Sequence, residues 1–103
     1  MSVSNAFMTF AEQAPEQHAA WMTVVMALDE ASALDARTEE LAYLAVLAAE
    51  GMESGLPFHV QQARAAGATR EEVGSAVLVG LPAVGHRVVA VLPAALAAYD
   101  AAG

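Results

Sequence analysis

Apolar residues recur along the chain at intervals of three and four positions, the spacing of one face of an α-helix. No stretch alternates apolar and polar residues in the way that a half-buried strand requires. Residue types that favour helices, such as Ala, Leu and Glu, dominate between the prolines and glycines. The pattern predicts an all-α bundle of about six helices, at about 6–13, 15–30, 36–50, 54–66, 70–80 and 86–101.

Capping residues mark several of these boundaries. Asp35 is placed to cap the third helix, and Gly51 is placed to end it. Thr69 and Glu72 have the spacing of a capping box at the start of the fifth helix. Glycine and proline residues predict a break at about 81–85, before the last helix begins.

Two of the predicted helices carry patterns typical of deep burial. No charged residue occurs from position 41 to position 49, so we expect the third helix to lie at the centre of the bundle. The second helix carries one apolar face with the i, i+3, i+4, i+7 spacing, formed by Trp21, Val24, Val25 and Leu28.

The apolar content of the chain indicates an assembly of several copies and not a monomer. The 103 residues suffice for one domain, spanning 1–103. Apolar residues make up 57% of the chain and the mean hydropathy is +0.45, which is high for a small soluble domain. A monomer of this size has too little interior to hide that surface. We therefore expect an obligate homo-oligomer.

Charge excludes several classes of partner. Twelve acidic residues face four basic ones, all Arg, for a net charge of −8. Such a chain has no basic footprint for nucleic acid and is repelled by an anionic membrane surface. The most apolar region, 73–99, is interrupted by glycines, prolines and Arg87, so we expect no membrane span. The first ten residues lack the pattern of a secretory signal, and we expect a cytoplasmic protein.

Few residues are available for chemistry. The chain has no Cys and no Lys, which excludes disulfides, thiolate metal sites and thiol redox chemistry. Glu40 lies one turn before Tyr43 on an otherwise apolar face, a setting that suits proton transfer near neutral pH. The alternative is a partly exposed glutamate favoured by the helix dipole. His59, on the fourth helix, is either catalytic or a hydrogen-bonded structural histidine.

The remaining histidines have weaker patterns. His86 beside Arg87 suggests either an anion contact or a cap for the last helix, and capping is the favoured interpretation. His18 is expected on a solvated face. No His-x-x-x-His or Glu-x-x-His pair occurs, so we expect no metal site.

The chain contains the segments LDARTEELAYLAVLAA at 34–49, FHVQQARAAGATREEV at 58–73 and AVLVGL at 76–81. These three segments resemble the carboxymuconolactone decarboxylase (CMD) family, which includes the AhpD-like alkylhydroperoxidases. The family core thus covers about 34–81. The resemblance implies an AhpD-like helical bundle that assembles into a homotrimer or a homohexamer.

The resemblance also implies where the site lies. In the AhpD-like branch, a Cys-x-x-Cys pair precedes the histidine by seven and four residues, and a relay glutamate lies twelve residues before the first cysteine. Counting back from His59 gives Met52 and Gly55 for the cysteines and Glu40 for the glutamate. The chain is thus similar to a family member that lacks both cysteines. The resemblance implies a pocket at Met52 and Gly55 that also includes Ser54 and Tyr43. The chain has neither thiol that peroxide reduction requires.

Three functional hypotheses follow. The favoured one is a non-redox binding or scaffold-type oligomer that retains a Glu–His pair. The second is a cofactor-free lyase or decarboxylase-like enzyme that uses Glu40 and His59 for acid/base chemistry on a small lactone or organic acid. An adapted pocket that binds a metal is the third and weakest, and we expect no cofactor.

Overall fold

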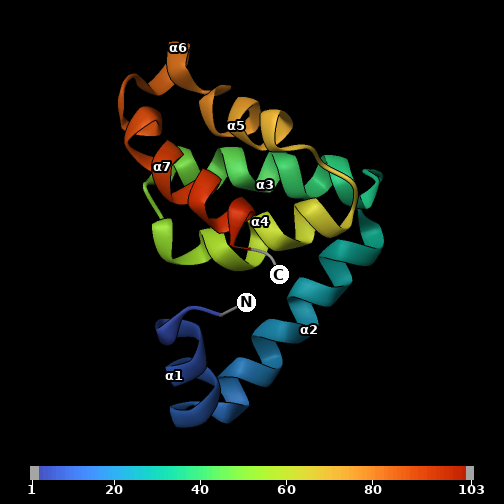
Figure 1. The fold of residues 1–103 in the computed structure, drawn as a ribbon. Coiled ribbons are helices and arrows are strands. Elements are labelled where there is room, and N and C mark those ends of the chain that lie inside the picture. Colours follow the sequence, from blue (N-terminus) through green and yellow to red (C-terminus); the bar gives the residue numbers. More distant parts are fainter. Residues whose placement is uncertain (1–2, 102–103) are drawn as a thin grey trace.

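The computed structural model describes residues 3–101, which fold entirely into helices, turns and short connections (Figure 1). The all-α prediction is confirmed. The elements are α1 (Asn5–Gln13), α2 (Pro15–Ala31), α3 (Ala36–Glu50), a 3₁₀ turn η1 (Glu53–Gly55), α4 (Leu56–Ala65), α5 (Arg70–Leu78), α6 (Leu81–Val84) and α7 (Arg87–Asp100).

Four helices form the bundle that holds the core. Helix α3 packs against α4 and α5, and α7 packs against the same two helices (Figure 1). Only one face of α3 is buried, because Tyr43 and Val46 on its other side are exposed. The expectation that this helix is central thus holds for its inner face alone. The largest buried side chains of the core are Leu44, Leu56, Val60, Val73, Val77, Val88 and Val91.

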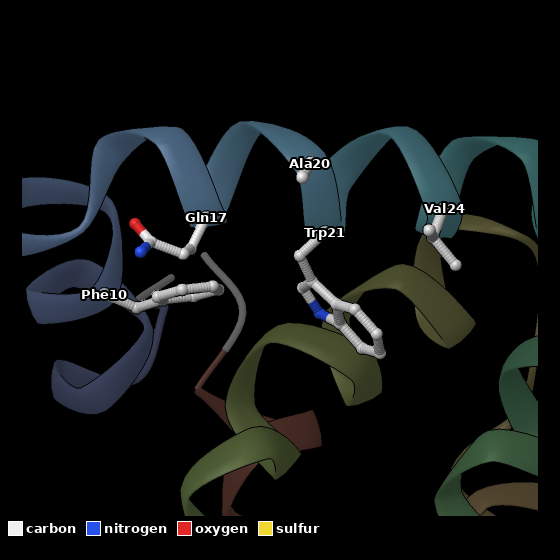
Figure 2. Close-up of a pocket in the computed structure, with 5 residues that line it drawn as sticks. All are labelled: Phe10, Gln17, Ala20, Trp21 and Val24. Carbon is white, nitrogen blue, oxygen red and sulfur yellow. The ribbon is translucent and has the colours of Figure 1, made fainter.

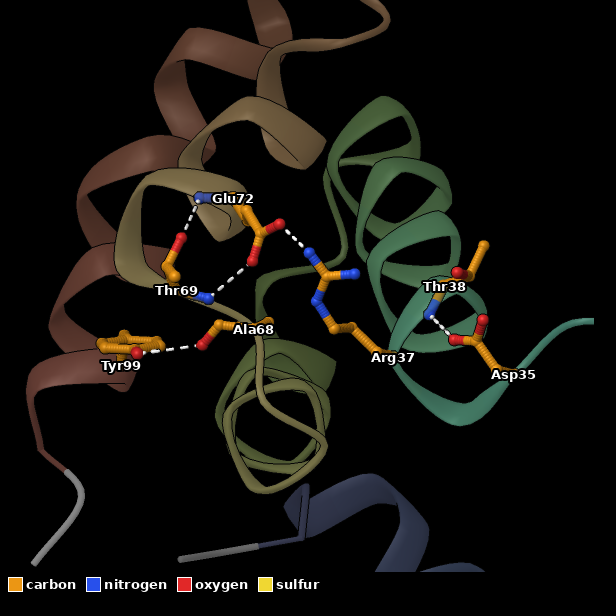
Figure 3. Close-up of polar contacts among 7 residues, drawn as sticks. All are labelled: Asp35, Arg37, Thr38, Ala68, Thr69, Glu72 and Tyr99. Carbon is orange, nitrogen blue, oxygen red and sulfur yellow. Dashed lines mark hydrogen bonds and ion pairs between the residues drawn. The ribbon is translucent and has the colours of Figure 1, made fainter.

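The caps predicted at Asp35, Gly51 and Thr69 form, and they fix both ends of α3 and the start of α5. The Thr38 N–H donates to the Asp35 carboxylate at 2.8 Å, and this hydrogen bond lowers the pKa of Asp35 (Figure 3). Gly51 ends α3 with a φ of +69°, a left-handed conformation that favours glycine. Thr69 and Glu72 exchange both hydrogen bonds of a capping box.

Polar side chains tie the bundle together at its helix ends. The Glu72 carboxylate also pairs with the Arg37 guanidinium, which joins the start of α5 to the start of α3 (Figure 3). The Tyr99 hydroxyl donates to the Ala68 carbonyl at 2.9 Å and so fixes the end of α7 against the loop before α5 (Figure 3). Two hydrogen bonds from Arg70 hold the same end and lower the pKa of Asp100.

The break expected at 81–85 is present, but it contains a helical turn of its own. Helix α5 ends at Leu78, the four-residue α6 follows, and Gly85 turns the chain with a φ of +78° before α7 begins. The apolar region 73–99 is therefore divided among three helices. Within residues 3–101, no helix is long and apolar enough to cross a bilayer.

The prediction that the apolar face of α2 is deeply buried is wrong for a single copy of the chain. This face does not reach the core, and α2 has no buried residue. Helices α1 and α2 pack mainly on each other and project from the bundle as an arm (Figure 1). The radius of gyration is 14.0 Å, against about 13 Å for a compact chain of this length. The residues of the predicted apolar face are all exposed, namely Trp21, Val24, Val25 and Leu28.

Candidate functional site

Glu40 and His59 meet between α3 and α4. The Nδ1 atom of His59 lies 2.9 Å from the Oε1 atom of Glu40, within hydrogen-bond distance. Each side chain is 23% exposed. The packing of α3 on α4 thus brings together two side chains that are 19 residues apart in the sequence, in a place that solvent still reaches.

Two aromatic rings frame the imidazole. The Tyr43 ring is stacked on the His59 ring with centroids 4.1 Å apart and planes 26° apart. The Phe58 ring stands nearly perpendicular to it, at 5.1 Å and 86°. Tyr43 was predicted at the site without this role, and Phe58 was not predicted there. The signal for Tyr43 was present, because a residue three positions after Glu40 lies on the same helix face.

The second ring nitrogen of His59, Nε2, is not sealed from solvent. It has no hydrogen-bond partner among residues 3–101, and no side-chain nitrogen or oxygen in this range is both buried and unpaired. An ionised carboxylate only accepts hydrogen bonds. With Glu40 ionised, the proton of the neutral ring therefore lies on Nδ1, and the lone pair on Nε2 is available to a reactant.

Met52 and Gly55, the positions that the resemblance assigns to the cysteines, lie at the turn before α4. Met52 is 52% exposed and precedes η1, and Ser54 is exposed within this turn. Gly55 donates its N–H to the Met52 carbonyl at 3.4 Å and stands at the N-cap of α4. His59 follows Gly55 by one helical turn, so the two positions share a side of α4.

The favoured prediction for His86, a cap of the last helix, is wrong. His86 stands at the N-cap of α7, but its side chain makes no capping hydrogen bond. Both His86 and Arg87 are exposed, and their predicted role as an anion contact stays a prediction. The His18 ring is half-buried, since it lies 5.2 Å from the Phe7 ring and 5.3 Å from the Phe10 ring.

A separate apolar pocket of about 380 Å³ lies in the arm (Figure 2). It does not include Glu40 or His59. The pocket was not predicted, although four of its five lining residues follow helical spacing along α2 and the fifth, Phe10, lies on α1. Its lining residues are Phe10, Gln17, Ala20, Trp21 and Val24. In the described part of the chain, no three His, Asp or Glu side chains converge in a way that would hold a metal ion.

Comparisons with known proteins identify the family of the chain. The model of the "Carboxymuconolactone decarboxylase family" matches residues 15–101, which is most of the chain and extends beyond the segments that carry the resemblance. No curated protein and no solved structure matches the chain. The protein is therefore a member of the carboxymuconolactone decarboxylase family, and one that contains no cysteine.

Proposed function

We propose that this protein is a non-redox member of the CMD family in which Glu40 and His59 transfer protons without a cofactor. The observation that supports the proposal is the 2.9 Å contact between the two side chains at a partly exposed position. In a pair with a purely structural role, we expect both ring nitrogens of the histidine to be hydrogen-bonded within the protein. This pair instead leaves Nε2 of His59 accessible to a reactant.

The reaction class that fits is acid/base chemistry on a small lactone or organic acid. Nε2 accepts a proton from the substrate, and the Glu40 carboxylate stabilises the imidazolium that forms. The same nitrogen then returns the proton to the product. Loss of carbon dioxide also requires a place for the electron pair, so a decarboxylated substrate must itself carry a conjugated acceptor.

Thiol peroxidase chemistry is not part of this proposal. It requires a thiolate to attack the peroxide oxygen and a second thiol to resolve the sulfenic acid. Met52 and Gly55 stand at the corresponding positions, and the chain contains no cysteine elsewhere.

A second candidate function is a binding or scaffold-type oligomer in which the pair is only structural. The exposed apolar face of α2 favours it, since Trp21 is 53% exposed and Leu28 is 65% exposed. A helix without charge from Gln17 to Leu28 and without buried residues calls for a covering surface. Another copy of this chain, in a homotrimer or a homohexamer, would supply it.

The acid/base proposal predicts a specific loss of turnover. In a screen of small lactones and carboxylic acids, we expect Glu40→Gln to lower kcat on the best substrate by on the order of 100-fold, because it removes the carboxylate that stabilises the imidazolium. Glu39→Gln is the matched control, since it removes the same charge one position away and should retain the wild-type rate. Equal rates for wild type and Glu40→Gln would end the proposal.

The assembly proposal predicts a trimer or hexamer in sedimentation velocity at micromolar concentration. Leu28→Glu places a charge on the exposed apolar face of α2 and should shift the protein toward the monomer. Thr23→Glu adds the same charge on the opposite side of α2, where the Thr23 hydroxyl bonds the Ala19 carbonyl, and should leave the assembly intact. A monomeric wild type would refute the assembly.

The mapping of the cysteine positions predicts that sulfur chemistry can be restored. Residues i and i+3 of a turn have Cα atoms within about 7 Å, near the upper limit of about 6.8 Å for a disulfide. We expect the double variant Met52→Cys/Gly55→Cys to form an intrachain disulfide on mild oxidation, seen by mass spectrometry as the loss of two hydrogen atoms. Met52→Ser/Gly55→Ser is the control. Two thiols that stay reduced would contradict the mapping.

A further inference from the structure

The orientation of the His59 ring is not fixed by its own torsion angles. The χ2 torsion of histidine joins an sp³ atom to a planar ring and has broad minima. The Glu40 side chain, whose Oε1 atom lies 2.9 Å from Nδ1, is long and itself rotatable. Since both side chains are 23% exposed, the hydrogen bond alone leaves the ring free to turn away. Another contact must hold the ring plane.

Tyr43 supplies that contact from the same helix face as Glu40. The two residues are three positions apart on α3 and both reach the His59 ring, one at Nδ1 and one across its face. A ring stacked at 4.1 Å and 26° blocks rotation out of its plane, while the perpendicular Phe58 ring restricts movement in another direction. The hydrogen bond and the stack therefore constrain the ring in complementary ways.

We propose that Tyr43 is the positioning residue of this site. Its ring holds the His59 imidazole in the orientation in which Nδ1 contacts the Glu40 carboxylate, so that Nε2 is the ring nitrogen that faces the reactant. The inference rests on the proposed function only in naming Nε2 as the proton-transferring atom. The orientation itself is a property of the free protein.

The chemistry of Tyr43 favours this role over a general contribution to stability. Its side chain is 47% exposed, so it adds little burial to the core. Its hydroxyl makes no hydrogen bond within residues 3–101, whereas the Tyr99 hydroxyl donates to the Ala68 carbonyl. What Tyr43 presents to the site is the ring face, and a phenylalanine has the same face.

The test is nuclear magnetic resonance of the histidine ring nitrogens in the neutral state, without substrate. In the wild type we expect a protonated Nδ1 and an unprotonated Nε2 for His59, and ring protons shifted upfield by the stacked tyrosine. Tyr43→Phe should retain both signatures. Tyr43→Leu should give a mixture of the two tautomers and lose the upfield shift. His86, which is exposed, is the internal reference for an unconstrained ring.

Val46→Ala is the matched control variant. It shortens another exposed side chain three positions further along α3, and it should leave the His59 signals unchanged. If Tyr43→Leu does not fold, Tyr43→Met gives the same comparison with a longer, more adaptable side chain. A single Nδ1–H tautomer that persists in the Leu or Met variant would overturn the positioning role, as would a wild type with the proton on Nε2.

The outcome separates this inference from the proposed function. A fixed tautomer that depends on Tyr43, together with no turnover on any lactone or carboxylic acid, would support the positioning role and refute the acid/base enzyme. Turnover that depends on Glu40, together with a tautomer indifferent to Tyr43, would overturn the positioning role and leave the enzyme standing.

Discussion

Helices α3 and α4 pack against each other over buried side chains that include Leu44, Leu56 and Val60, and this apolar contact places Glu40 beside His59. Burying one such side chain contributes about 1.5–3 kcal/mol, whereas one hydrogen bond contributes about 0.5–1.5 kcal/mol net. The packing therefore positions the polar pair, and the pair contributes less than the packing to holding the helices together. Loss of the pair is expected to weaken the fold without unfolding it.

Much of this arrangement could be predicted from local signals. Capping residues such as Asp35 and Thr69 act within one turn of the helices that they start, so their effect is visible in the sequence. The apolar spacing predicted most of the helix ranges for the same reason, but the uncharged stretch 41–49 did not reveal which face of α3 is buried. Glu40 could be placed on the face that bears Tyr43, and family resemblance then pointed to His59 as the residue opposite it.

What the sequence left open depends on contacts beyond one turn. The period of α2 identifies its apolar face, but it cannot say whether that face meets the chain's own core or another surface, and the face is exposed. His18 lies against two phenylalanines because α1 folds back on α2. The stack of Tyr43 on His59 likewise requires the relative position of two helices, which no spacing within α3 reveals.

The most direct test of the central claim is a double-mutant cycle on the free energy of unfolding, with Glu40→Ala, His59→Ala and the double variant measured in urea. A hydrogen bond between the two side chains predicts a coupling energy of about 1 kcal/mol at neutral pH. Strict additivity, within about 0.3 kcal/mol, would contradict the account, because it would mean that Glu40 and His59 do not interact in solution.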